Sequence, residues 1–413
     1  MTNVGDTEIA AMLDKTLAWS RARGYRGYNK HDGLNSPLLR LLLGWGKWPR
    51  IIAIQGVMRF PVNLRPLLLV KKTLNPKGLA LFTRAWLHDH QISGQPAALH
   101  QAQSLLAILL QQRAPGDWRG LCWGYHYPWQ DPGFYAPPKT PNAVVTSFVC
   151  EAFLHAYRVT GNDDYLEVVN QAIPFYFQHL QRLKDTDSEL CLSYMPLPMR
   201  MRVMDVSILI AAVVAQYCKL SGDDQWLDHA HRLATYVTRQ QTDYGAWYYT
   251  DPPEDSLIRH DNYHTGFILD ALQRYHDACA TPCPAGYTKG LQFYADRLFN
   301  QDGSPRWMSD QDFPHDIHGA AQGILTFSRH LDHYHELAGR ILNWSRNRMW
   351  NSDGRFYYQQ TRYFRKRFTL MRWCNAWMAR ALAAYLYQRH RQRKPQHSVP
   401  PDSTLNTAHH GIP

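Results

Sequence analysis

Hydrophobic and polar positions along this chain predict two kinds of helix. Residues 143–157 and 206–218 are apolar on nearly every side. Residues 165–183 and 226–237 carry a single apolar stripe at helical spacing. A helix that is apolar all round must be buried on all sides, whereas a striped helix keeps one face in water. The pattern therefore predicts buried inner helices that alternate with amphipathic outer helices.

The pattern repeats along the chain. Loops with aromatic residues occur at 118–127, 190–195, 244–249, 304–308 and 355–358. Each loop is followed by a helix head, and successive heads lie 55 to 63 residues apart, at Asn142, Asp205, Asp261, Asp316 and Arg372. This spacing fits one helical hairpin with its loop.

Five such units and a divergent N-terminal region make six hairpins. We therefore predict an all-α fold, an (α/α)6 toroid with an inner and an outer ring of helices. An open solenoid is the alternative, but neither terminal unit resembles the polar cap that a solenoid requires. In a closed toroid the inner helix heads and the aromatic loops share one face, which becomes a funnel.

The divergent region and the C-terminus define the expected domain limits. Helices are predicted over residues 8–23, 76–91 and 95–112, and short helices broken by prolines over 38–72. Residues 1–388 form the predicted single domain. Residues 389–413 are rich in Arg, His, Pro, Ser and Thr, and this composition predicts a disordered basic tail.

Composition and charge narrow the class of protein. Hydrophobic residues make up 45% of the chain and the net charge is +11, so a large core and an anionic partner are both expected. No nucleic-acid-binding module is recognisable, so we expect no nucleic-acid partner. An acidic glycan and membrane phosphates explain the charge equally well, and the oligomeric state stays open.

The cysteines and the N-terminus indicate the compartment. The seven cysteines are an odd number and lie mostly in apolar runs, as is typical of reduced core thiols. No secretory signal and no apolar run of about 18 residues is present. We expect a cytoplasmic protein, and peripheral contact with an anionic inner-membrane surface is compatible with its charge. No metal or cofactor is expected.

Two helix heads carry Asp and His in nearly the same order, in residues 261–264 and 316–318. Glycosidic cleavage requires a proton donor and a second group that attacks or activates water. Candidate catalytic residues are Asp205, Asp261, His264, Asp316 and His318, and glycoside hydrolysis is the leading reaction. The simpler interpretation is that each Asp only caps its helix.

Other functions fit the same residues. Sugar epimerisation requires two bases, for which His264 and His318 are candidates. A lyase would use Tyr263 or a His as base, with Asn262 and Arg259 neutralising a uronate. A noncatalytic glycan-binding partner of a polysaccharide assembly machinery, with its basic tail at the membrane, is a further alternative.

Substrate contacts are predicted mainly from the aromatic loops. Trp123, Tyr125 and Trp129 lie in a long loop and are suited to stacking on sugar faces, although loop aromatics also pin hairpins together. Asn142 and Gln322 fit hydroxyl recognition, with capping and packing as the alternatives. The predicted ligand is a glycan or a lipid-linked sugar.

The chain resembles the VpsJ-like family of polysaccharide biosynthesis proteins over about residues 20–388. The resemblance is carried by residues 63–68, 75–80, 123–125 with 129–130, 140–147, 204–207, 261–266 and 318–322. It implies a six-hairpin toroid and a role in exopolysaccharide or lipopolysaccharide assembly. More distantly, the architecture is similar to that of six-hairpin glycosidases, polysaccharide lyases and sugar 2-epimerases.

Overall fold

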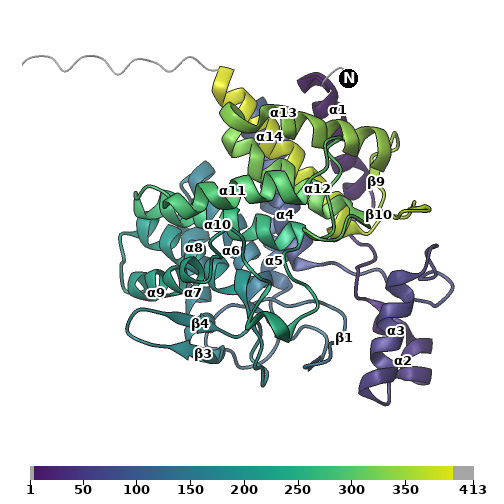
Figure 1. Ribbon diagram of the computed structural model, residues 1–413, viewed down its shortest axis with the longest axis horizontal. Helices are drawn as coiled ribbons and strands as arrows, with labels where there is room; N and C mark the ends of the chain where they lie inside the picture. The colour runs from purple at the N-terminus through teal and green to yellow at the C-terminus, as the bar shows by residue number, and fades with distance from the viewer. Residues whose placement is uncertain (1–3, 394–413) are drawn as a thin grey trace, which may run out of the picture.

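The computed structural model describes residues 4–393, and most of them form a closed double ring of helices (Figure 1). In the inner ring each helix packs against the next and the last packs against the first. The six inner helices are α4 (Pro76–Ser93), α6 (Ala143–Thr160), α8 (Met204–Ser221), α10 (Asn262–Cys279), α12 (Ile317–Phe327) and α14 (Trp377–Arg393). The predicted toroid is therefore confirmed, and the open solenoid is wrong.

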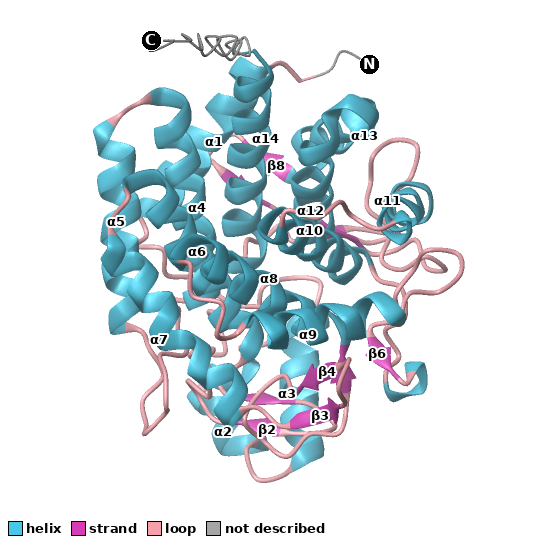
Figure 2. Cartoon of the chain, turned by 90° about the vertical axis from the view of Figure 1, so that its left-hand side faces the viewer, coloured by secondary structure: helices cyan, strands magenta, loops and turns pink. Residues whose placement is uncertain are grey.

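Each inner helix packs against one outer helix. The outer helices are α5 (Pro96–Gln111), α7 (Asp163–His179), α9 (Leu227–Arg239), α11 (Ala285–Leu298), α13 (Leu331–Trp344) and α1 (Asp6–Arg21). The sixth pair is made by the two ends of the chain, because α1 packs on α14. In Figure 2 both lie at the top of the molecule.

Burial follows the hydrophobic pattern. In α8 every residue from 204 to 218 is buried, whereas α9 buries only the stripe made by Ala230, Leu233, Ala234, Tyr236 and Val237. Within the described residues, α8 alone is long and apolar enough to cross a membrane, and 83% of it is buried inside the ring. Gly161 and Gly222 end α6 and α8 with φ of 68° and 74°, the left-handed conformation of a helix C-cap.

Short strands and turns connect the helices. The antiparallel pairs are β1 (Trp129–Gln130) with β2 (Tyr135–Ala136), β3 (Arg182–Asp185) with β4 (Leu190–Leu192), β5 (Arg202–Val203) with β6 (Thr250–Asp251), and β8 (Trp350–Asn351) with β9 (Arg355–Phe356). A three-stranded sheet has the order β11 (Arg365–Lys366), β10 (Gln359–Gln360), β7 (His315–Asp316). Single turns are η1 (Gly33–Asn35), η2 (Pro253–Asp255), η3 (Ser328–His330), η4 (Ser345–Met349) and η5 (Met371–Ala376). Several of these pieces lead directly into inner helix heads.

Two helices lie outside the double ring. α2 (Pro37–Leu43) and α3 (Lys47–Arg59) project at the bottom of the molecule, away from α1 and α14, in both Figure 1 and Figure 2. They are held by a small core of their own, formed by Leu34, Ala53 and Ile54 with Trp129 packed against it.

The expected domain boundary at residue 388 falls inside α14, which continues to Arg393. Arg389 and Arg393 pair with Asp6 of α1, with N–O distances of 3.6 and 2.6 Å. These residues therefore belong to the domain. The rest of the predicted tail, residues 394–413, lies outside the described residues.

A buried ionic cluster ties the ring together. Glu151 of α6 pairs with Arg84 of α4 at 3.2 Å and with Arg274 of α10 at 3.0 Å. Asp270 pairs with Arg274 and, at 2.9 Å, with Arg329. Although burial raises the pKa of Asp270, the guanidinium groups of Arg274 and Arg329 lower it to about 2. The cluster joins several inner helices through charge as well as packing.

Candidate active site

The head of α10 holds a paired carboxylate and imidazole. Asp261 is the N-cap residue of α10, yet its side chain makes no capping bond. Instead its oxygens accept a hydrogen bond from His264 Nδ1 at 2.8 and 2.9 Å. Asp261 is 1% exposed, whereas His264 is only partly buried. The pairing fixes the orientation of the imidazole and leaves Nε2 as the nitrogen available to a ligand.

Asp205 lies in the first turn of α8, which packs against α10, and is close enough to His264 and Asp261 to interact with them electrostatically. It is 3% exposed, and within residues 4–393 its Oδ1 has no hydrogen-bond partner. Burial raises the pKa of Asp205; His264 and Lys77 act against that shift, and Asp261 adds to it. Asp205 is therefore a carboxyl group that keeps its proton to higher pH than usual and has an oxygen free for a ligand.

His318, in the first turn of α12, is enclosed by aromatic rings. Its ring stacks on Tyr263, with centroids 4.6 Å apart and an interplanar angle of 11°. Trp373 and Trp377 lie at centroid distances of 4.4 Å. Neither ring nitrogen of His318 has a partner among the described side chains and backbone. Burial, Lys77 and Arg372 lower the pKa of His318 well below its usual value, so the imidazole is neutral.

Asp316 differs from Asp205 because the protein occupies both of its oxygens, and it differs from Asp261 because its partners include a backbone N–H that it caps and no histidine side chain. Oδ1 accepts from the backbone N–H of His318 at 2.9 Å and from Trp373 Nε1 at 2.8 Å. Oδ2 accepts from Gln359 Nε2 at 2.8 Å. Asp316 caps α12, as the simpler interpretation of this residue predicted.

Three buried cations complete the cluster, and sequence reasoning did not select any of them as site residues. Lys30 Nζ lies 3.9 Å from the ring centroid of Trp373 and near Asp316 and Asp261. Burial lowers the pKa of Lys30 to about 8. Lys77, at the head of α4, lies 3.9 Å over Phe148 and near Asp205. Arg372 lies 5.3 Å over Tyr125.

Lys30 and Lys77 could not be recognised from the sequence because they lie far along the chain from the Asp and His residues of the later helix heads, and Arg372 was recognised only as a helix head. Lys30 lies in the loop after α1, and Lys77 begins the first inner helix. They meet Asp316 and Arg372 only because the ring closes between α14 and α4. The one sequence signal was the Pro-Lys-Gly start of α4, whose Gly78 lets Arg372 approach; a Cβ there would lie 3.2 Å from Arg372 Cβ.

Tyr125, Trp129 and Tyr263 lie with this group, as a substrate-binding role would require. Tyr263 also contacts Trp307 and Trp373 at centroid distances of 6.2 and 5.4 Å. Trp129 packs edge-on to Tyr125 at 6.2 Å. The three aromatic side chains therefore lie at the end of the toroid where the inner helices begin.

The other predicted substrate contacts bond within the protein or lie on an exposed loop, although Asn142 Nδ2, at the head of α6, has no partner within the described residues. Trp123 is fully buried and donates to the Leu109 backbone oxygen at 2.7 Å, so it staples the loop to α5. Asn262 donates to the Leu298 backbone oxygen at 2.7 Å and so points to the outer ring. Asn142 caps α6, bonding Val145 N–H at 2.8 Å. Arg259 is exposed on the preceding loop.

Gln322 lies about one turn below His318, inside the ring. It lines a small cavity together with Asp270 and Arg380. Within residues 4–393, no cluster of three or more His, Cys, Asp or Glu side chains is arranged to hold a metal ion.

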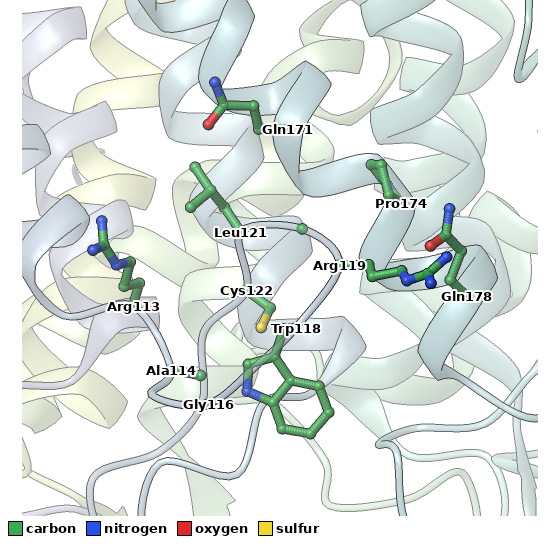
Figure 3. Close-up of a pocket in the computed structure, with 11 residues that line it drawn as sticks. Arg113, Ala114, Gly116, Trp118, Arg119, Leu121, Cys122, Gln171, Pro174 and Gln178 are labelled. Carbon is green, nitrogen blue, oxygen red and sulfur yellow. The ribbon is translucent and has the colours of Figure 1, made fainter.

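One cavity of the described structure lies apart from the candidate site. It has a volume of about 620 Å³ and lies between the loop at 113–122 and α7, as Figure 3 shows. Trp118, Arg119 and Gln178 line it, and none of the candidate catalytic residues does. The candidate site is assigned to the inner helix heads because buried polar atoms without partners and the Asp261–His264 pair lie there. The cavity beside α7 contains none of these groups.

No protein-family model and no curated protein sequence matches this chain. Solved structures do match. A cellobiose 2-epimerase from Bacillus thermoamylovorans is similar with a TM-score of 0.56 and 13% identity, over 77% of this chain and 89% of that one. A GH76 α-mannanase from Bacteroides thetaiotaomicron has a TM-score of 0.57 and 15% identity, over 77% and 87%.

A polysaccharide lyase matches over more of the chain, covering 94% of this chain and 98% of its own, with a TM-score of 0.56 and 10% identity. Identities this low establish the architecture and not the reaction. The protein therefore has the (α/α)6 toroid fold, which it shares with hydrolases, epimerases and lyases that process carbohydrates.

Proposed function

We propose that this protein is a glycoside-hydrolase-like enzyme that cleaves a glycan at the inner helix heads. The observation that carries the proposal is the free, buried Oδ1 of Asp205 beside the Asp261–His264 pair. Asp205 serves as the general acid, and His264, held by Asp261, serves as the base. This arrangement separates an acid and a base within one site, as glycosidic cleavage requires.

Asp205 donates its proton to the glycosidic oxygen while the bond from that oxygen to the anomeric carbon breaks. A water molecule attacks the anomeric carbon, and its proton passes to His264 Nε2. Asp261 stabilises the imidazolium that forms. The raised pKa of Asp205 supports its role, because a general acid must hold its proton near the working pH.

The proposed substrate is an acidic glycan. Lys30, Lys77 and Arg372 are each at most 5% exposed and lie near the carboxylates, and burial lowers the pKa of both lysines. A uronate or phosphate substituent beside them would favour their charged forms and bind to them. The resemblance to VpsJ-like proteins suggests a glycan or lipid-linked precursor of exopolysaccharide or lipopolysaccharide. A cytoplasmic location is part of the proposal, because the sequence has an odd number of cysteines, mostly in apolar runs.

A second candidate is proton abstraction from a sugar, as in an epimerase or a lyase. Its support is that both nitrogens of the neutral His318 lack partners in the described part of the chain. His318 and His264 would then act as the two bases. The product separates the reactions: hydrolysis gives a new reducing end, a lyase gives an unsaturated sugar, and an epimerase leaves the chain length unchanged.

The test uses a panel of oligosaccharides with and without uronate groups, with products analysed by mass spectrometry. Asp205→Asn should lower turnover by about 10²-fold to 10⁴-fold and retain binding. The control is Asp243→Asn, which changes an exposed carboxylate in a loop. Binding without turnover by the unaltered protein would show a noncatalytic glycan-binding protein. Full activity in Asp205→Asn would contradict the proposal.

A further inference from the structure

The α2–α3 projection, residues 37–69, displays an unusual amount of apolar surface. Of the fifteen large hydrophobic side chains that are exposed in the described structure, ten belong to it. They are Leu38, Leu41, Leu42, Trp45, Trp48, Ile52, Phe60, Val62, Leu67 and Leu69, of which Leu41 is 81% and Trp45 77% exposed. So many exposed large hydrophobic side chains concentrated on one projection are typical of an interaction site.

This surface is held in place by the fold. Ser36 caps α2 by accepting from Leu39 N–H at 3.0 Å, and its hydroxyl donates to the Leu68 backbone oxygen. Leu34, Ala53 and Ile54 form the small core underneath, while α2 itself buries none of its residues. The leucines and tryptophans are therefore presented outward from a folded support.

The charged side chains of the projection itself all have one sign, although Asp131 of the neighbouring turn between β1 and β2 lies near Lys47. No Asp or Glu occurs between Gly33 and His88. Exposed basic side chains surround the apolar residues, namely Arg40, Lys47, Arg59, Lys71 and Lys72. Such a surface is complementary to a partner that has a layer of negative charge over an apolar interior. A two-fold contact between copies of this chain would instead bring like charges together.

The projection is also joined to the candidate active site. Trp129, which lies beside Tyr125 at the inner helix heads, packs on the core of the projection and stacks on His31 at 5.7 Å. Arg50 of α3 bonds Gln130 at 3.4 Å and lies 4.3 Å over Tyr135. Whatever binds the projection is therefore brought next to the end of the ring that carries Asp205 and Asp261.

We propose that the α2–α3 projection docks the protein on the surface of an anionic lipid bilayer. Its leucines and tryptophans enter the boundary between headgroups and acyl chains, and its lysines and arginines bind lipid phosphates. The protein lies on the bilayer without crossing it. This inference is independent of the proposed reaction, because it depends only on the surface of residues 37–69.

The test measures co-sedimentation of the full chain with vesicles of phosphatidylcholine, with and without phosphatidylglycerol. The wild-type protein should bind the anionic vesicles, and binding should weaken as salt is raised. Combined Leu41→Gln, Trp45→Gln and Trp48→Gln should reduce binding by about tenfold or more, as should combined Arg40→Gln, Lys47→Gln and Arg59→Gln.

A matched pair of single variants provides the control. Leu41→Gln should weaken binding, whereas Leu257→Gln, which changes a leucine that is 96% exposed in another loop, should not. Hydrogen exchange of the wild-type chain provides a readout that needs no variant: anionic vesicles should protect the amides of α2 and α3 selectively.

Two results would overturn the proposal. One is that the wild-type protein binds neither kind of vesicle and forms a dimer that the leucine and tryptophan substitutions convert to a monomer. The projection would then bind a second copy of this chain. The other is unchanged vesicle binding by both triple variants.

Discussion

His264 donates a hydrogen bond from Nδ1 to Asp261, the residue three positions earlier at the start of the same helix. Asp261 is buried and uses its carboxylate for this bond rather than for capping, so it orients a side chain that faces the candidate site. This relationship distinguishes Asp261 from Asp316, whose oxygens are occupied by a cap, a Trp and a Gln.

Substituting Asp261→Asn should therefore act through His264. We expect kcat on an oligosaccharide substrate to fall by about 10²-fold or more while KM changes little, because the imidazole loses its fixed tautomer and orientation. The unfolding midpoint should stay close to that of wild type, since Asn is also tolerated at this position of a helix. A large rise in KM with unchanged kcat would assign Asp261 to binding instead.

Trp123 and Trp129 lie six residues apart and should behave in opposite ways. Trp123→Ala should destabilise the fold by about 3–5 kcal/mol, because it removes a fully buried ring and the bond to Leu109. Trp129→Ala should weaken glycan binding with a smaller loss of stability. Urea denaturation and glycan titration of the two variants check this, and equal losses of binding would place Trp123 in the site.

Stability should depend on Asp270 in acid. Its folded pKa of about 2 lies below the value of about 3.9 expected for the unfolded chain. The ionised carboxylate therefore stabilises the fold fully above about pH 4, and this contribution, about 2–3 kcal/mol, is lost as the pH falls towards 2. Urea unfolding between about pH 6 and pH 2 measures it.

Asp270→Asn is the control for that experiment. It should be less stable than wild type at neutral pH, because Arg274 and Arg329 lose their buried partner, and its stability should fall less steeply in acid. The same acid slope in both proteins would show that other carboxylates account for the effect.

Because of Lys30, the affinity for an acidic glycan should fall at alkaline pH. Since its pKa is about 8, the ammonium group is charged below that pH and is neutralised above it. Affinity for a uronate oligosaccharide should fall as the pH rises through about 8, whereas affinity for a neutral oligosaccharide should change little. Lys30→Gln should remove this pH dependence, and calorimetric titration at several pH values tests it.

The sequence by itself determined the architecture. α8 is apolar on all sides, whereas α9 has one apolar stripe. This difference predicts which helix is inner and which is outer, because the period of the apolar residues along a helix reflects which of its faces are buried. The even spacing of helix heads then specified hairpins of similar length, and these heads were also the correct place to look for polar groups. Trp129 and Tyr263 followed from the same reasoning.

Only the tertiary structure decided which of those polar groups face one another. Asp261, Asn262 and Tyr263 are consecutive, yet Asn262 bonds the outer ring while its neighbours face the candidate site. Lys30 reaches Asp316 only because the ends of the ring meet. Periodicity records whether a position is buried, but a packed core and an enclosed site bury side chains equally, so the direction of each side chain depends on contacts between segments distant in the sequence.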